Sequence, residues 1–450
     1  MPAELNTDVL NHIRHAIELG QEQHIRQMLA EWYPADIAEV IRQLNDTEAL
    51  IVFKAISSET ASEVLLELDE ERREILLSSL STKQIAQQLD NMDSDDAADV
   101  ISELPENIQT EVLSQIEDIT QASDIAELIT YQEGTAGSLM AKELVRVYTS
   151  DHVSQCIHQI REQAENVDVM YAVYVVDEVG RLRGMLSLKR LIIAHPMARV
   201  EELFEPDIIS VNVLATSEEV AGIMQKYDLV VLPVIDTLGR LVGRITIDDV
   251  VDVIRESADE QVQRLSGLSD DVDPNDRFWR NSRARIPWLL VGMCGGIIGS
   301  RIIGAYETQI RIHPEMAYFI PLIGAMGGNV GVQSSAIIVQ GLANRSIISN
   351  TIIPRLLKEL GVGVLNGLIC AVLIWSYAFI IQDWQLAATV SMSLFTVILC
   401  ASVLGTFVPL TLNRFKINPA LATGPFVTTL NDIIGITIYF LVGRLLYGLF

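Results

Sequence analysis

Short apolar runs at helical spacing fill the first 130 positions of the chain. Segments such as PADIAEVIRQL and KQIAQQLDNM place apolar side chains at i, i+3 and i+4, and polar turns separate one segment from the next. Short helices that recur in this way stack into a superhelix, because no single one can bury its apolar face alone. Residues 1–130 are therefore predicted to form an all-α superhelical domain.

The pattern changes to alternating apolar strands after this helical region. Two segments match each other at an offset of 59 residues, YAVYVVDEVGRLRGMLSLKRLI and LVVLPVIDTLGRLVGRITIDDVV. In this match Asp177 corresponds to Asp236, and Gly180 corresponds to Gly239. Each copy has the order strand, tight turn, strand and helix. This repeat resembles a tandem pair of CBS modules, an α/β arrangement expected over residues 131–255.

Five long apolar segments follow a stretch from Asp248 to about Asp271 that is expected to form a long helix ending in a polar loop. The segments cover roughly 286–306, 315–340, 356–381, 387–412 and 419–449. Each has about the 20 apolar residues that a helix needs to cross a ~30 Å hydrocarbon core. We therefore expect a linking helix and loop over residues 256–283 and a five-helix transmembrane domain over residues 284–450.

Charge separates the two halves of the chain. Of 59 acidic residues, 54 precede residue 277, whereas 12 of the 32 basic residues follow residue 276. The basic residues gather before the first apolar segment and in the loops after the second and fourth, at Arg277, Arg280, Arg283, Arg285, Arg345, Arg355, Lys358, Arg414 and Lys416. The positive-inside rule then predicts a cytosolic N-terminus and an external C-terminus. No cleavable signal pattern is expected at the N-terminus.

Two apolar segments carry polar groups that a lipid-facing helix would not need. The second contains GAMGGNVGVQSSA, which includes Asn329, and the fifth contains Pro425, Thr428 and Asp432. A lone ionisable group in hydrocarbon costs on the order of 3 kcal/mol, so Asp432 is a functional-site hypothesis by default. Pro425 is expected to interrupt a helix, and the small, acidic face around it is typical of a cation-pore wall.

Structural roles remain as alternatives for these residues. The glycines of the second segment are also typical of a tight helix–helix seam without an ion role. Asp432 could instead form a salt bridge with Arg301 in the first segment. At helical spacing, Ala422 and Gly435 are expected to share the face of Asp432.

The order of these parts and the membrane motifs together carry a family resemblance. GGNVGVQ lies in the second apolar segment, and NPAL, GP and TLND follow one another in the fifth. Over its whole length the chain resembles the MgtE family of bacterial magnesium channels. The resemblance implies a multi-pass homodimer of the bacterial cytoplasmic membrane, with a Mg²⁺ pore on the twofold axis and Asp432 as the pore aspartate. It further implies closure by cytosolic Mg²⁺ bound between the helical domain and the CBS pair.

The resemblance also implies a set of regulatory metal ligands. These are Glu63, Asp95, Asp99, Gly137 through its carbonyl, Asp228, Asp249, Asp252 and Glu260. Four of the carboxylates, Asp95, Asp99, Asp249 and Asp252, are expected to meet around Mg²⁺ across a domain boundary. The chain departs from the family where Ser257, Gln261 and Asn418 replace acidic residues and Gly424 replaces a polar one. Weaker binding is therefore expected on the linking helix.

Nucleotide binding and other functions complete the hypotheses. CBS pairs often bind adenine nucleotides such as ATP, and Thr246 and Asp249 stand where that family's ribose-contacting motif falls; the alternative is a helix-start cap. The competing function is an ion-coupled carrier for Co²⁺, Mn²⁺ or Mg²⁺ that nucleotide regulates at the CBS pair. An anion channel would need basic pore residues. The chain has no hydrolase, zincin or P-loop pattern, and its four cysteines have no metal-ligand spacing, so no enzyme is expected.

Overall fold

The chain folds into two compact units, Met1–Arg255 and Glu256–Phe450. The computed structural model describes residues 7–164, 167, 169–268, 272, 278–343, 352–381, 384–422 and 424–447. Arg277 and Arg345, which contribute to the predicted orientation, lie outside the described residues. Each unit is described by itself.

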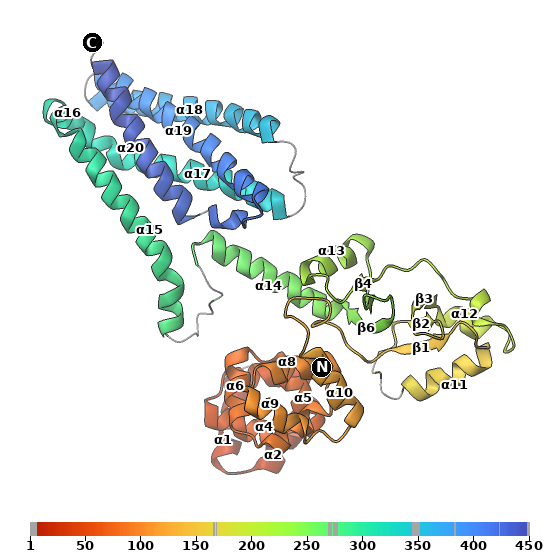
Figure 1. Ribbon diagram of the computed structural model, residues 1–450. Helices are drawn as coiled ribbons and strands as arrows, with labels where there is room; N and C mark the ends of the chain where they lie inside the picture. The colour runs from red at the N-terminus through yellow and green to blue at the C-terminus, as the bar shows by residue number, and fades with distance from the viewer. Residues whose placement is uncertain are drawn as a thin grey trace. The chain divides into compact units, whose positions relative to one another are not determined.

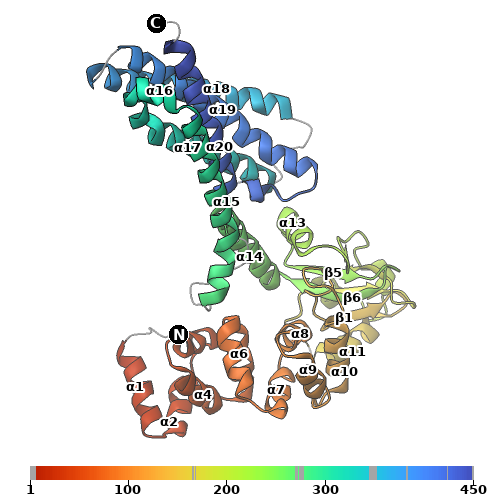
Figure 2. The ribbon, with the colours of Figure 1, turned by 60° about the vertical axis from the view of Figure 1, so that its left-hand side comes forward.

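Ten short helices open the first unit (Figures 1 and 2). They are α1 Thr7–Glu18, α2 Glu22–Leu29, α3 Pro34–Arg42, α4 Asp46–Ala55, α5 Ser58–Glu67, α6 Glu70–Ser78, α7 Thr82–Leu89, α8 Ser94–Ser102, α9 Glu106–Leu113 and α10 Ile119–Leu128. Most pack against the helix two positions further along: α3 on α5, α5 on α7, α7 on α9 and α8 on α10. The predicted all-α superhelical region is confirmed.

Side-chain caps fix where several of these helices begin. The side chain of Asn45 accepts a hydrogen bond from the backbone N–H of Glu48, and Glu48 accepts one from the backbone of Asn45 in return. Ser81 and Gln84 form the same capping box at the start of α7. Each box satisfies N–H groups that the first helical turn leaves without partners.

Two similar modules with three strands each complete the first unit. The first contains β1 Val145–Tyr148, α11 Val153–Gln163, β2 Val173–Val176, β3 Leu182–Leu186 and α12 Leu188–Ile193. The second contains β4 Val211–Asn212, α13 Ser217–Tyr227, β5 Val231–Ile235 and β6 Leu241–Thr246. In both sheets the first two strands are parallel and the last two antiparallel. The α/β repeat is therefore confirmed.

The matching turns of the two modules have the same geometry. Gly180 and Gly239 have φ of +83° and +80°, in the left-handed region that glycine tolerates. Asp177 Oδ1 accepts hydrogen bonds from the backbone two and four residues later, at 3.0 and 2.8 Å. The corresponding distances at Asp236 are 2.9 and 2.8 Å.

The second module shares its core with the helical region. Ile125 of α10, Val220 of α13 and Ile245 of β6 belong to one continuous cluster of buried apolar side chains. The sheet of the first module has a separate core that includes Val145 and Val175. The second module is therefore packed directly onto the helices, and residues of the two regions can form a common site.

The linking helix α14 covers Ile247–Leu265. Gly267 adopts φ +81°, and the backbone N–H groups of Gly267 and Leu268 bond back to Arg264 and Gln263, each at 3.1 Å. This is a Schellman motif, which ends a helix at a left-handed residue. The helix therefore ends before the polar loop that was predicted up to about residue 271, and residue 271 itself lies outside the described residues.

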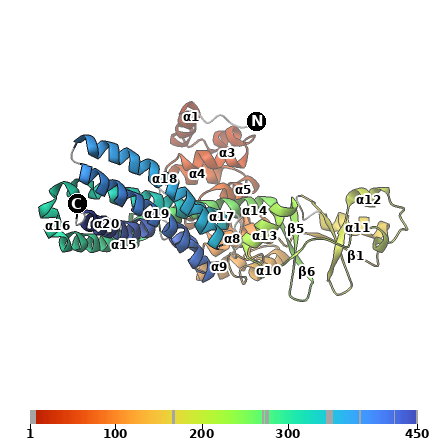
Figure 3. The same ribbon diagram turned by 90° about the horizontal axis from the view of Figure 1, so that it is seen from above.

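Long apolar helices make up most of the second unit (Figure 3). Its elements are α15 Phe278–Ala305, α16 Glu307–Ile312, the 3-10 turn η3 Pro314–Phe319, α17 Ile320–Ala343, α18 Ile352–Ile381, α19 Trp384–Arg414, the 3-10 turn η4 Pro419–Ala422 and α20 Pro425–Tyr447. Among the described residues, five helices are long and apolar enough to cross a membrane. α17 and α18 pack along α19, and α15 and α17 pack along α20.

Two predicted segment starts were wrong. The first helix begins at Phe278, about two turns before the predicted residue 286, because its first turns are polar and a hydropathy pattern does not register them. The fifth segment is not one helix from residue 419, since η4 comes first and α20 begins at Pro425. Proline suits the first position of a helix, where its missing N–H would have no partner.

Candidate metal centres

A cavity of about 550 Å³ lies between α15, α17 and α20 in the membrane unit. Glycines make much of its wall. It is lined by Gly292, Gly295, Gly296, Gly299, Ser300, Ile303, Ile320, Pro321, Gly324, Ala325, Gly328, Asn329, Thr428, Thr429, Asp432, Ile433 and Ile436. Because glycine has no side chain, three helices lie close together while space remains between them.

Asp432 faces the glycines of α17 across this cavity. A methyl group built on Gly324 would lie 3.5 Å from Asp432 Oδ1, and one built on Gly328 would lie 3.6 Å from it. Gly324 and Gly328 are four residues apart and share one helix face. The carboxylate therefore has open space beside it where larger residues would place side chains.

The adjacent residue, Asn431, is directed toward a second glycine pair. Its side chain is only 3% exposed, and a methyl group on Gly331 would lie 1.8 Å from its Nδ2. A methyl group on Gly327 would lie 3.6 Å from the backbone oxygen of Asn431. The two rows of glycines on α17 thus have different settings: one borders the cavity at Asp432, and the other is packed tightly against Asn431.

The structure places the predicted pore residues in different settings. Asn329, Thr428 and Asp432 line the cavity, but Pro425 does not. Its ring instead lies where a side chain on Gly267 would be, 2.5 Å from the position of that Cβ. Gly435 was also misplaced by the prediction, because it is buried toward Val397 and Ile323.

Asp432 does not have the salt bridge that was considered as the alternative. Arg301 is exposed, and no basic residue in the described part of the chain forms an ion pair with Asp432. The sequence prediction missed a second carboxylate in the membrane unit. Glu359 of α18 accepts a hydrogen bond of 2.7 Å from the hydroxyl of Ser334 on α17. Its position in the eighth residue of a long apolar helix was the available signal.

A second candidate centre lies in the first unit, where helical region and second module meet. Asp93, Asp95 and Glu143 each offer a carboxylate oxygen within 4.8 Å of the other two. Asp93 precedes α8, Asp95 lies in its first turn, and Glu143 comes just before β1. Carboxylate oxygens are the ligands that Mg²⁺ and Ca²⁺ prefer. Below, these three residues are called the acidic triad.

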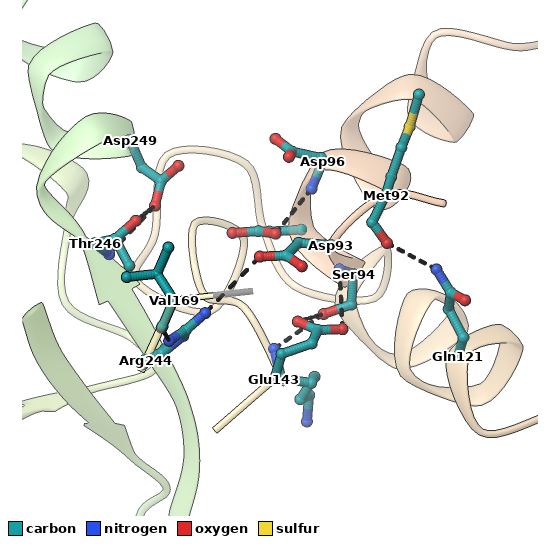
Figure 4. Close-up of polar contacts among 12 residues, drawn as sticks. Met92, Asp93, Ser94, Asp96, Gln121, Glu143, Val169, Arg244, Thr246 and Asp249 are labelled. Atoms are coloured by element: carbon teal, nitrogen blue, oxygen red, sulfur yellow. Dashed lines mark hydrogen bonds and ion pairs between the residues drawn. The ribbon is translucent and has the colours of Figure 1, made fainter. Parts of the chain in front are cut away.

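Hydrogen bonds at the start of α8 hold the triad in place (Figure 4). Glu143 accepts hydrogen bonds from the backbone N–H of Ser94 at 3.1 Å and from its hydroxyl at 2.9 Å. The backbone N–H of Lys142 donates to the same hydroxyl at 2.9 Å. A carboxylate at a helix N-terminus is favourable, so the fold itself explains why Glu143 is directed toward α8.

Burial and mutual repulsion raise the pKa values of this group. Burial, followed by the charges of Asp249 and Asp96, raises the pKa of Asp95 well above its usual range. Burial, followed by the charges of Asp249 and Asp93, raises the pKa of Asp96 to about 7. Burial and the charge of Asp93 raise the pKa of Glu143. A divalent cation would relieve this repulsion, because it favours the charged form of every carboxylate around it.

The four carboxylates expected to surround one ion differ in their burial. Asp95 is buried, whereas Asp99 and Asp252 are exposed. Asp95 and Asp99 are four residues apart on α8 and differ in exposure along the same helix. Asp249 is half-buried and close enough to Asp95 and Asp96 to affect their pKa values. Asp93 and Glu143, which the sequence prediction missed, lie close to Asp95.

The remaining predicted ligands are spread over both units. Gly137 is buried beside the ring of Tyr131, and its backbone N–H donates to the oxygen of Val213 at 2.9 Å. Glu63 on α5 is exposed, as is Asp228, which ends α13 with φ +52°. Glu260 on α14 forms an ion pair with Arg264. The structure does not bring Glu63 and Asp228 into the triad.

Thr246 and Asp249 form a cap at the start of α14. The Asp249 carboxylate accepts hydrogen bonds from the backbone N–H of Thr246 at 3.2 Å and from its hydroxyl at 2.7 Å. These bonds lower the pKa of Asp249, but burial and repulsion outweigh them and raise it to about 6. The geometry is that of the helix-start alternative considered from the sequence.

Family models match three successive parts of the chain. The model described as MgtE intracellular N domain matches residues 32–134, and the CBS domain model matches residues 136–196 and 200–256. The model described as divalent cation transporter matches residues 320–442. These matches follow the order of the helices, modules and membrane helices described above.

Relatives match the chain over nearly its full length. It is 33% identical over 444 residues to the magnesium transporter MgtE of Thermus thermophilus, covering 96% of this chain and 97% of the relative. It is 28% identical over 425 residues to the magnesium transporter MgtE of Bacillus subtilis, covering 94% and 93%. A crystal structure of the cytosolic domain of the Mg²⁺ channel MgtE in complex with ATP has 33% identity and a TM-score of 0.51, covering 54% of this chain and 99% of that one.

Proposed function

Because the chain belongs to the MgtE family of magnesium transporters, we propose that it conducts Mg²⁺ across the bacterial cytoplasmic membrane through the second unit. In this proposal the helical region, residues 1–130, and the module pair, residues 131–255, regulate the pathway. Residues 256–283 link them to the transmembrane domain, residues 284–450. Its relatives are transporters, and we propose no enzymatic activity for it.

One observation carries the proposal: Asp432 lies in a glycine-walled cavity between three membrane helices. Mg²⁺ dehydrates reluctantly and usually keeps several waters, so its pathway needs space as well as negative charge. The Asp432 carboxylate supplies the charge, and the bare faces of Gly324 and Gly328 supply the space beside it. Polar groups of Asn329 and Thr428 in the same wall can hydrogen-bond to the waters of the ion.

Substitution of the carboxylate tests this proposal. Asp432→Asn keeps the shape of the side chain and removes its charge, so we expect Mg²⁺ uptake into proteoliposomes to fall to background, as in Asp432→Ala. Glu307→Gln is a suitable control, because Glu307 is an exposed carboxylate that pairs with Arg311 at 2.6 Å. Uptake near the wild-type rate in Asp432→Asn would contradict the electrostatic role. Competition by Co²⁺, Mn²⁺ and Ni²⁺ in the same assay would define the selectivity.

We propose further that cytosolic Mg²⁺ closes the pathway by binding at the acidic triad and Asp249. The support is the buried, mutually repelling carboxylates at the boundary between the helical region and the second module. An ion shifts such an equilibrium only by its differential affinity for the two states. We expect millimolar Mg²⁺ to protect residues 1–255 from protease, and replacement of Asp95, Asp99, Asp249 and Asp252 by Ala to abolish closure by internal Mg²⁺ in patch-clamp recordings.

Assembly, orientation and nucleotide binding belong to the same proposal. We propose a homodimer with a cytosolic N-terminus and an external C-terminus, as the basic residues predict. A reporter fused after Phe450 should be accessible from outside the cell; cytosolic accessibility would contradict the five-span orientation.

Because a similar cytosolic domain was crystallised with ATP, we also propose nucleotide binding near Thr246 and Asp249. Calorimetric titration of Thr246→Val with ATP tests this assignment.

A further inference from the structure

A buried arginine stands beside the acidic triad. Arg244 lies in β6, and its side chain is 5% exposed. Its backbone exchanges two hydrogen bonds with Ala141, at 2.9 and 2.8 Å. Ala141 is two residues before Glu143. The backbone pairing of Ala141 with Arg244 therefore holds Arg244 close to this member of the triad.

Two segments besides β6 contact the guanidinium group, one through Val169 and Tyr171 and the other through Asp93; Figure 4 shows Val169 and Asp93. Nη1 donates a hydrogen bond of 2.9 Å to the backbone oxygen of Val169, and the group lies 5.8 Å from the ring centroid of Tyr171. Nη2 is 3.8 Å from Asp93 Oδ2. Close charge-assisted hydrogen bonds measure about 2.7–2.9 Å, so the bond to Val169 is the tighter contact and holds the cation at a fixed distance from the triad.

Arg244 has a permanent charge at this position. A guanidinium does not lose its proton in proteins and has no lone pair for a metal, so it cannot become a ligand. Lys142, the nearest basic residue to Glu143 in the sequence, instead forms an ion pair with Glu127 at 2.7 Å. A divalent cation at the triad would therefore share Asp93 with Arg244 and would be repelled by it.

We propose that Arg244 is a tethered counter-charge that competes with Mg²⁺ for Asp93 and so raises the Mg²⁺ concentration at which the triad fills. This inference rests on the proposed regulation of the protein by Mg²⁺ at the triad. Without metal, Arg244 relieves part of the repulsion among the carboxylates and stabilises the boundary. With metal, its charge opposes the ion. Removal of the charge should therefore have opposite effects on metal-free stability and on metal affinity.

The test measures both quantities on the full chain in detergent. In Arg244→Met, we expect the melting temperature in EDTA to fall. The Mg²⁺ concentration that half-protects residues 1–255 from protease should also fall, by about tenfold, which corresponds to ~1.4 kcal/mol. Arg244→Lys, which keeps the charge, should stay within about twofold of wild type, on the same scale. A purely structural defect would lower stability without increasing Mg²⁺ affinity.

Matched variants separate the possible results. Arg240→Gln removes an exposed arginine of the neighbouring turn, which pairs with Asp236 at 2.7 Å. It should leave the Mg²⁺ concentration for half-protection unchanged. If Arg244→Met does not fold, Arg244→Gln serves, because its amide can still donate to Val169. In an Asp93→Asn background, Arg244→Met should lower the Mg²⁺ concentration for half-protection by less than it does in the wild-type background.

If a folded variant that lacks the charge of Arg244 has an unchanged or raised Mg²⁺ concentration for half-protection, the counter-charge role is overturned. Absence of any Mg²⁺ protection in the wild type overturns the proposed regulation itself.

Discussion

The two candidate metal centres use carboxylates in opposite ways. At the triad, carboxylates from distant segments are held within 4.8 Å of one another, with little space and strong repulsion. In the membrane unit, Asp432 lies among glycines beside a cavity of about 550 Å³. A site that binds an ion stably and joins two regions of the protein, as proposed for the triad, benefits from many ligands. A site that is to release its ion quickly benefits from one charge and from waters that stay in place.

The largest expected effect separates packing glycines from cavity glycines in the membrane unit. Gly331→Ala would place a methyl group 1.8 Å from Asn431 Nδ2 and 2.9 Å from Val427 Cγ1. We expect a loss of stability of more than about 3 kcal/mol, typical of severe overpacking in a core, and little folded protein in size-exclusion chromatography. Gly292→Ala, which meets nothing within 4 Å, should elute as the wild type does. Normal folding of Gly331→Ala would show that α17 and α20 separate easily.

The second effect concerns the charges of Asp96 and Asp249 beside the triad and depends on pH. Because the folded pKa values of Asp96 and Asp249 are raised to about 7 and about 6, the folded state binds more protons than the unfolded state between about pH 4 and pH 7. Metal-free stability should therefore fall as the pH rises from 5 to 8, by up to about 4 kcal/mol. Thermal melts in EDTA should show this slope.

Saturating Mg²⁺ provides the comparison for the same melts. An ion at the triad favours the charged carboxylates, so the loss of stability at high pH should disappear when Mg²⁺ is present. A pH slope that is identical with and without Mg²⁺ would mean that these carboxylates do not bind the ion.

The smallest effect tests whether the open space beside Asp432 increases the rate of Mg²⁺ uptake. The methyl group of Gly324→Ala would be at an ordinary contact distance, 3.5 Å from Asp432 Oδ1, so the protein should fold. It would displace water from the side of the carboxylate. We expect Mg²⁺ uptake to fall about tenfold, or ~1.4 kcal/mol in the barrier. An uptake rate equal to that of Gly361→Ala, whose methyl group would meet nothing within 4 Å and lies outside the cavity lining, would show that the ion does not use this face of the cavity.

Local patterns predicted the elements of this fold well. The turns at Gly180 and Gly239 follow from short-range chemistry, as do the capped helices and the apolar spans, because each depends on residues within a few positions of one another. Asp432 was conspicuous in the sequence because a charge in an apolar segment is rare. These features needed no knowledge of how distant segments pack.

Contacts between distant segments could not be predicted in this way. Asp95 and Asp99 have helical spacing, but only packing of α8 against the second module decides that Asp95 is the buried one. Glu143 reaches the start of α8 from 49 residues beyond Ser94. Arg244 lies in a strand whose alternation does not show that Asp93 is opposite. The break before Pro425 was visible as a proline, but its use as a helix start depends on the preceding turn.

The contact between Gly267 and Pro425 has a mechanical consequence within the membrane unit. The turn that ends α14 has no side chain at Gly267, and the proline that begins α20 occupies the space where one would stand. This contact is tightly packed, since no flexible side chain lies between the two backbones that could change its conformation when one of them moves. A movement of the end of α14 toward α20 would therefore push directly on the first turn of the helix that carries Asp432, two turns further along.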